Sequence, residues 1–175
     1  MTIRGITNKI KDILIPLYKS LVRSILEYAN PVWCPYLRKH IDLIEGVQRR
    51  FKKHIIGCSG LSYIDRLKFL GLPSLEFRRA RGDLIEVYKI MHGLYDSNTT
   101  SSLFQPFVSG ITRGHNLKIC KKRTNTNLYN HCFTNRVVNA WNNLSLETVN
   151  AFSVNAFKNS WGGKGITAFY VLKPI

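Results

Sequence analysis

The carboxylates of this 175-residue chain are the first candidates for chemistry, and their spacing argues against nucleotidyl transfer. Two-metal phosphoryl transfer needs carboxylates that converge on a pair of magnesium ions. Among the 10 Asp and Glu residues there is no Asp-Asp or Asp-x-Asp pair, and most stand near Lys or Arg at helical spacing. We therefore expect surface and capping roles for them, no catalytic residue, and no enzymatic activity of the chain on its own.

Cysteine and histidine are the next candidates, as metal ligands or nucleophiles. The sequence contains no C-x-x-C pair. Cys120, His131 and Cys132 could approach one another, but adjacent His and Cys residues rarely chelate one ion well. We therefore expect Cys34, Cys58, Cys120 and Cys132 to be small buried thiols, with no metal site and no cofactor.

Positive charge is the strongest chemical signal in the chain. The sequence has 26 Lys+Arg against 10 Asp+Glu, a net charge of +16, and a surface this basic attracts polyanions. Three sets of cations stand out: Arg49, Arg50, Lys52 and Lys53; Arg78, Arg79 and Arg81; and Lys118, Lys121, Lys122 and Arg123. Any one set could be an ordinary solvated face. Together they favour binding of RNA, DNA or an RNA–DNA hybrid through phosphate contacts, without base-specific readout.

The first two sets have distinct helical contexts. On a helix, the four cations around Phe51 cover an arc of about 160° with Phe51 opposite its middle, so burial of Phe51 would turn all four outward. Glu45 would offset one of them at i,i+4. The set from Arg78 to Arg81 opens a helix, where a cation opposes the helix dipole, and this suggests a ligand that compensates the charge.

The elements that must position these cations are helices. Apolar periodicity predicts a mainly α fold, a bundle of about five or six helices, over about residues 16–30, 37–56, 62–70, 73–92 and 128–144, with a last short helix capped by Ser153. The first helix could extend back to Ile10 with a kink. Ser62 and Asp65 form a capping box, and Gly71 ends that helix. A short irregular or β segment is expected near 110–124.

The periodicity also predicts which faces are buried. The expected inward residues are Leu17, Leu21, Ile25 and Tyr28 of the first helix, Leu37, Ile41, Ile44, Val47, Phe51 and Ile55 of the second, and Tyr129, Phe133, Val137, Ala140, Trp141 and Leu144 of the fifth. Residues 96–102 form a polar stretch that is the best linker candidate.

Targeting and membrane signals are weak. The N-terminus lacks a long apolar run and a small-residue cleavage site, and apolar stretches fall short of a membrane span. We therefore expect an intracellular protein, nuclear or cytoplasmic rather than secreted, with no membrane as partner.

Several stretches resemble the region that follows the catalytic palm in reverse transcriptases of non-LTR (LINE-type) retrotransposons, most of all the jockey, CR1 and L2 group. The longer ones are YKSLVRSILEYANPVW (18–33), LGLPSLEFRR (70–79), DLIEVYKIMHG (83–93) and RVVNAWN (136–142). Shorter matches lie at 47–50, 61–67, 112–115 and 153–158. Order and spacing follow the family over about residues 16–160.

The resemblance implies a thumb-like helical region over 1–95 and a C-terminal helical extension over 103–161, whereas the tail over 162–175 is unlike the family. In that family this segment contacts the template–primer duplex rather than performing chemistry. The family's Tyr/Phe-Ala-Asp-Asp polymerase motif is absent here. The resemblance therefore implies a truncated, catalytically inactive fragment of an RNA-directed DNA polymerase, a basic nucleic-acid-binding module whose protein partner would be the missing palm domain. The alternatives are a non-functional or partner-dependent helical fragment, or a domesticated protein-interaction module.

Overall fold

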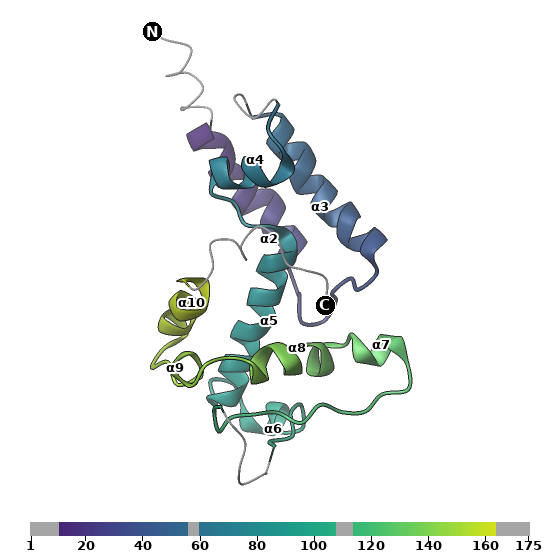
Figure 1. Ribbon diagram of the computed structural model, residues 1–175, viewed down its shortest axis with the longest axis vertical. Helices are drawn as coiled ribbons and strands as arrows, with labels where there is room; N and C mark the ends of the chain where they lie inside the picture. Colours follow the sequence, from purple (N-terminus) through teal and green to yellow (C-terminus); the bar gives the residue numbers. More distant parts are fainter. Residues whose placement is uncertain (1–10, 56–59, 108–113, 164–175) are drawn as a thin grey trace. The chain divides into compact units, whose positions relative to one another are not determined.

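The computed structural model describes residues 11–55, 60–107 and 114–163 (Figure 1). Within these ranges the regular structure is helical, and β pairing is limited to an isolated antiparallel bridge between Pro106 and Ile119. The predicted mainly α fold is confirmed. The described residues form two compact units, the first from 11–29, 35–55 and 60–79, the second from 30–34, 80–107 and 114–163.

The first unit begins with a helix that changes its winding. Residues 11–17 are α-helical, the π-helical segment η1 covers Tyr18–Val22, and α2 covers Arg23–Glu27. The amide of Arg23 donates to the carbonyl oxygen of Tyr18, five residues earlier, which is the hydrogen bond of a π-helix. Ile15 and Tyr18 are buried on the inner face of this helix.

The predicted inner face of the first helix is wrong. Leu17, Leu21, Ile25 and Tyr28 are between 47% and 76% exposed. Two apolar rows run along this helix, one through Ile15 and Tyr18 and one through Leu17, Leu21 and Ile25, and periodicity alone does not say which row is covered. The row that is buried is the one that places a tyrosine hydroxyl next to a hydrogen-bonding partner.

The next two helices follow their sequence signals closely. Helix α3 covers Arg38–Lys53 and α4 covers Tyr63–Leu70. The predicted capping box is confirmed at α4, where the hydroxyl of Ser62 accepts a hydrogen bond of 3.2 Å from the amide of Asp65. Gly71 ends α4 with a φ of 60°, a left-handed conformation that glycine adopts at no steric cost. Gly57 and Cys58 lie outside the described residues.

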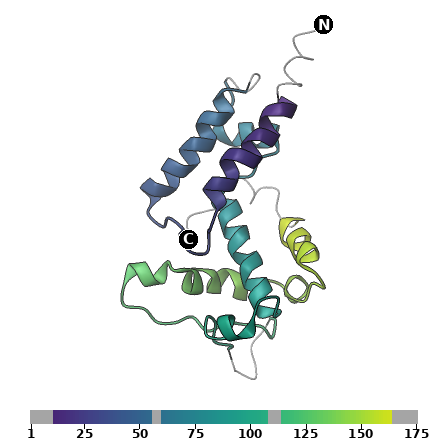
Figure 2. The ribbon, with the colours of Figure 1, turned by 180° about the vertical axis from the view of Figure 1, so that it is seen from behind.

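The core of the first unit lies where the first helix, α3 and α4 meet. Figure 2 shows the first helix and α3 side by side. The buried apolar residues are Ile15, Tyr18, Ile55, Leu67, Leu70 and Leu72. Phe51 is partly buried and stacks on the Tyr18 ring, with 4.2 Å between ring centroids. The fully buried residues of α3 itself are polar, namely Glu45, Gln48 and Lys52.

Helix α5 covers Leu75–Met91, and the chain passes from the first unit to the second within it, between Arg79 and Ala80. Short helices follow: α6 over Ser97–Thr100 and α7 over Asn127–Asn130, then α8 over Phe133–Asn142, α9 over Leu146–Val149 and α10 over Val154–Gly163. The predicted linker at 96–102 contains α6, whose first turn is capped by the Asp96 carboxylate. Residues 164–175, most of the predicted tail, lie outside the described residues.

The predicted helix over 128–144 is two helices. The chain turns at His131 and Cys132 between α7 and α8. Trp141 is fully buried as predicted, and its indole nitrogen donates to the carbonyl oxygen of Leu117 at 2.7 Å. Tyr129 is exposed rather than inward because the break rotates α7 away from the face that α8 buries. Ser153 caps α10 as predicted, accepting from the amide of Ala156 at 3.1 Å.

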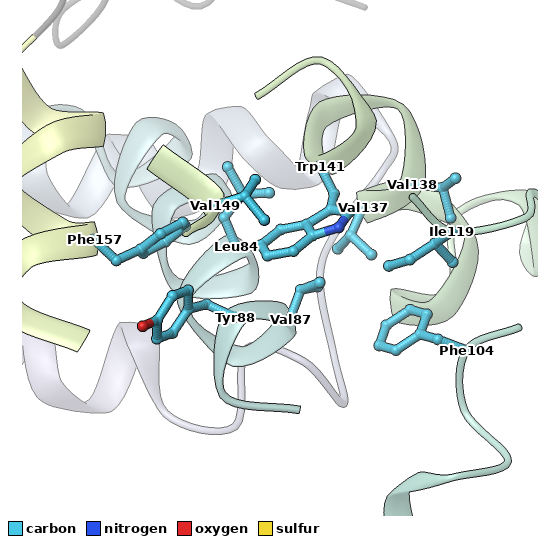
Figure 3. Packing of buried hydrophobic residues seen from close by; sticks show 10 residues of the cluster. All are labelled: Leu84, Val87, Tyr88, Phe104, Ile119, Val137, Val138, Trp141, Val149 and Phe157. Atoms are coloured by element: carbon cyan, nitrogen blue, oxygen red, sulfur yellow. The ribbon is translucent and has the colours of Figure 1, made fainter. Parts of the chain in front are cut away.

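Figure 3 shows the core of the second unit, which α5 and α8–α10 build together with the bridge segments. Its buried residues are Leu84, Val87, Tyr88, Phe104, Ile119, Val137, Val138, Trp141, Val149 and Phe157. Tyr88 stacks on Phe157 at 4.6 Å, and its hydroxyl donates to the carbonyl oxygen of Ala151. This core holds the extended segment around Ile119 in place.

A buried ionic cluster adds to this core. The carboxylate of Asp83 on α5 accepts two hydrogen bonds of 2.9 Å from the Arg136 guanidinium on α8 and one of 2.7 Å from the Asn30 side-chain amide. Arg136 also donates to the Asn30 carbonyl oxygen at 3.0 Å. Asn30 is therefore bound by both its side chain and its backbone.

Candidate nucleic-acid interface

The first set of cations divides into one buried and three exposed residues. Arg49, Arg50 and Lys53 lie on the solvent side of α3, whereas Lys52 is 0% exposed. The prediction that all four cations point outward is therefore wrong for Lys52. The helix is rotated so that Phe51 is only partly buried, and the residue after it takes the interior position.

The interior position of Lys52 has a specific partner. Its ammonium nitrogen lies 3.7 Å from the centroid of the Tyr63 ring, within the range of a cation–π interaction. The Tyr63 hydroxyl donates to one carboxylate oxygen of Glu45 at 2.5 Å. Burial, and then the nearby Glu45 carboxylate, raise the pKa of the Tyr63 phenol. Tyr63 thus remains a neutral donor between a cation and an anion.

Glu45 does not offset Arg49, contrary to the i,i+4 expectation. Its second carboxylate oxygen accepts a 2.8 Å hydrogen bond from the backbone amide of Glu76, in the first turn of α5. A carboxylate at this end of a helix satisfies an unpaired amide and interacts favourably with the helix dipole. Glu45 is therefore a capping group of α5.

Gln48 lies between Glu45 and Lys52 in the line of buried polar residues along α3. Its side-chain oxygen accepts from the Tyr18 hydroxyl at 2.9 Å, and its amide donates to the Pro73 carbonyl oxygen at 3.1 Å. Burial raises the pKa of the Tyr18 phenol, so this tyrosine too stays a donor. The line fixes the rotation of α3 about its axis, and that rotation decides which cations meet solvent.

The exposed face of α3 is a narrow stripe. Lys39, Leu43, Gly46, Arg50 and Lys53 fall within an arc of about 80° at 100° per residue. The four side chains of this stripe are exposed. At the fifth position, Gly46, an added Cβ would meet no atom within 4 Å. Among the described residues no carboxylate pairs with Lys39, Arg50 or Lys53. The sequence pattern did not indicate Lys39, because it lies ten residues before Arg49 and outside the cluster of cations.

Arg49 lies at the edge of this stripe and is partly neutralised. Its guanidinium is 3.9 Å from the Asp42 carboxylate and 5.1 Å from the Tyr63 ring centroid. Arg38, near the start of α3, pairs with Asp42 at 3.1 Å and with Glu76 at 3.5 Å. The uncompensated positive charge of α3 therefore lies at Lys39, Arg50 and Lys53.

The cations of the second set, Arg78, Arg79 and Arg81, are buried or bind other groups of the protein. Arg78 forms a two-point ion pair with Glu27, one contact being 2.8 Å between Nη2 and Oε2. Arg79 is buried, and Arg81 donates to the Lys158 carbonyl oxygen at 3.2 Å. The helix start that these cations oppose is capped by Glu45, so the compensating charge that the sequence suggested is supplied by the chain itself.

The third set lies on an extended segment of the second unit. Lys121, Lys122 and Arg123 are exposed, whereas Lys118 is half-buried, with its Nζ 3.3 Å from where a Cβ of Gly114 would stand. The three exposed cations follow one another without helical structure. Of the three predicted sets, the first and the third thus keep exposed cations without a described carboxylate partner, at Arg50 and Lys53 of the α3 stripe and at Lys121–Arg123.

Metal ligands and cysteines were the other candidates for chemistry. No three His, Cys, Asp or Glu side chains there gather so as to hold a metal ion. Cys34, Cys120 and Cys132 form no disulfide and are half-buried, so the expectation of buried thiols is wrong for these three. No described helix has the length and apolar character to cross a bilayer.

Family models, curated proteins and solved structures were compared with the chain, and none of the three comparisons gives a match.

Proposed function

We propose that the chain is a basic helical module that binds nucleic acid through phosphate contacts, with α3 as its main contact element. The observation that carries the proposal is the stripe of Lys39, Arg50 and Lys53, three exposed cations that no described carboxylate offsets. Lysine and arginine neutralise phosphates and release condensed counterions, which supplies most sequence-independent affinity.

The dimensions of the stripe suit a nucleic-acid backbone. Fourteen residues separate Lys39 from Lys53, which is about 21 Å along a helix at 1.5 Å per residue. That length corresponds to about six base pairs at 3.4 Å each. Gly46 lies in the middle of the stripe and has no side chain. A phosphate backbone can therefore approach α3 along its whole length.

The resemblance to LINE-type reverse transcriptases adds an origin to this proposal. We infer a thumb-derived, catalytically inactive piece of an RNA-directed DNA polymerase whose ligand is RNA, DNA or the hybrid of the two. Primer extension on a homopolymer template, with magnesium or manganese, should give no product beyond the primer. Extension by protein free of contaminating polymerase would overturn the inactive assignment, and an active reverse transcriptase in the same assay provides the positive control.

The binding proposal is tested by fluorescence anisotropy with an RNA–DNA hybrid at several salt concentrations. The double variant Arg50→Gln/Lys53→Gln should reduce the slope of log K against log salt by roughly 1.8 on a duplex, since each phosphate contact contributes about 0.9. The matched control is Arg38→Gln on the same helix, where Asp42 and Glu76 already offset the charge. An unchanged slope in the double variant would show that the stripe is only a solvated face.

The exposed apolar row on the first helix favours a second candidate, a partner-dependent helical protein. Ile13, Leu17, Leu21 and Ile25 are spaced four residues apart and are all exposed. A continuous apolar row on a helix surface is typical of a protein contact, and the resemblance suggests a polymerase palm as the partner. Binding of a hydrophobic dye that falls when Leu21 and Ile25 are replaced with Gln, with helicity kept, would support this candidate.

A further inference from the structure

The extended cationic segment of the second unit is held at both ends. The amide of Ile119 donates to the Asn142 side-chain oxygen at 2.9 Å, and the Asn142 side-chain amide donates back to the Ile119 carbonyl oxygen at 2.8 Å. Further along, the Thr124 hydroxyl donates to the Asn130 side-chain oxygen at 2.7 Å. Lys121, Lys122 and Arg123 therefore lie on a short strap, residues 120–124, between a fixed point on α8 and another on α7.

This strap has no local counter-charge. The sequence contains neither Asp nor Glu between residues 97 and 146. In the part of the chain that the structure describes, the cations of the strap form no ion pair, and the nearby polar residues are neutral Asn and Thr. A strap of three exposed cations therefore presents positive charge that only an outside anion can offset.

An exposed aromatic residue follows the strap in the chain, next to the residue that anchors it. Tyr129 on α7 is 64% exposed, and the Thr124–Asn130 hydrogen bond joins the strap to the residue that follows it. Figure 1 shows the chain running along this segment and turning back into α7. The sequence pattern predicted an inward position for Tyr129, so its exposure follows from the break between α7 and α8.

Cations on an extended backbone and an accessible ring together match one class of ligand. Single-stranded nucleic acid offers phosphates to the cations and the face of an unpaired base to the ring, whereas a duplex hides its base faces in the stack. We propose that Lys121, Lys122, Arg123 and Tyr129 form a binding site for single-stranded nucleic acid, in which Tyr129 stacks on a base. This proposal rests on the proposed function and assigns an unpaired strand to the second unit.

The test compares ligands that differ only in their bases. Tyr129→Ala should weaken binding of a short single-stranded oligonucleotide by roughly 5- to 150-fold, as base–aromatic stacking does elsewhere. It should leave binding of an abasic strand of the same length and of a duplex unchanged. Tyr129→Phe should keep wild-type affinity, and Tyr129→Leu should behave like Ala because it keeps apolar area but loses the ring. Oligo(U) against oligo(dT) then separates RNA from DNA as the natural strand.

Two controls make the result specific. Phe152→Ala removes another exposed aromatic of the same unit, 94% exposed, and should not change affinity. Replacing Lys121, Lys122 and Arg123 with Gln should lower the salt slope on single strands by roughly 2, at about 0.7 for each phosphate contact.

Equal loss with the abasic strand, or no loss in Tyr129→Ala while the wild-type protein binds, overturns the stacking site and leaves the proposed function standing. Absence of salt-dependent binding to any oligonucleotide overturns both. Binding to phosphatidylserine vesicles that depends on Tyr129, without binding to oligonucleotides, would make the site a membrane contact instead.

Discussion

The ammonium group of Lys52 lies 3.7 Å from the centre of the Tyr63 ring in the interior of the first unit, while the next residue, Lys53, meets solvent. Two lysines that are neighbours in sequence thus have opposite surroundings. One takes part in packing, and the other contributes to the exposed stripe of α3.

This contrast gives a matched pair of variants. Lys52→Ala should lower the free energy of unfolding by roughly 2 kcal/mol, since it removes a desolvated cation–π contact. Lys53→Ala should leave stability nearly unchanged and lower the salt slope on duplex DNA by about 0.9. Urea unfolding followed by circular dichroism and anisotropy titrations measure the two effects. A loss of stability in Lys53→Ala but not in Lys52→Ala would contradict the burial of Lys52.

The Asp83 carboxylate should be the most sensitive charge in the second unit. Asp83→Ala removes the carboxylate that pairs with the mostly buried Arg136 and should cost roughly 3 kcal/mol, because a poorly solvated charge is left without its partner. The control is Asp42→Ala, whose ion pair with Arg38 is exposed and should be worth about 1 kcal/mol or less. Similar costs for the two variants would show that the Asp83 cluster is solvated in solution.

His115 should make the second unit less stable in mild acid. It is buried, its Nε2 lies 3.1 Å from the Trp141 carbonyl oxygen, and no hydrogen bond reaches its Nδ1 among the described residues. Burial, and secondarily the charge of Lys118, lower the pKa of this imidazole below its ordinary value of 6.5. As the pH falls through about 6.5, the unfolded chain therefore binds a proton that the folded unit resists, and stability is lost until the pH lies below the folded pKa.

The readout is tryptophan fluorescence during urea unfolding at pH 7.5 and pH 5, because the described tryptophans all belong to the second unit. His115→Gln should remove this part of the pH dependence, whereas His40→Gln, at an exposed position on α3, should keep it. A protein with equal stability at both pH values would count against the neutral buried imidazole.

Gly46→Ala should stabilise the first unit. Glycine inside a helix costs about 1 kcal/mol relative to alanine, and no atom within 4 Å obstructs an added methyl group. The melting temperature followed by circular dichroism should rise. A fall would mean that the helix surface at Gly46 is covered in the folded protein.

Sequence patterns predicted the parts of this fold that depend on local chemistry. The Ser62–Asp65 capping box, the Gly71 stop and the burial of Trp141 are all present, because each depends on a few neighbouring residues. The sequence also predicts the exposed cations Arg50 and Lys53, which belong to the candidate site.

The sequence-based prediction was wrong where either of two faces of one helix could be buried. Periodicity assigned α3 an apolar inner line through Phe51, but the fully buried line is polar because Glu45, Gln48 and Lys52 find partners on other segments. Such partners come from residues that are 11 to 31 positions away in the sequence. Local patterns carry no information about them, so the engagement of Arg78 by Glu27 was missed for the same reason.

The π-helical segment Tyr18–Val22 determines which side chains the first helix turns inward after Tyr18. In a regular α-helix, Val22 and Leu26 would follow Tyr18 on the same side, four and eight residues on. With one extra residue in the turn, Arg23 and Glu27 take these places, and they form the ion pairs with each other and with Arg78. The helix therefore contains one residue more than its packing requires, and a chain shortened by one residue between Lys19 and Val22 would present the same inner face on an unbroken α-helix.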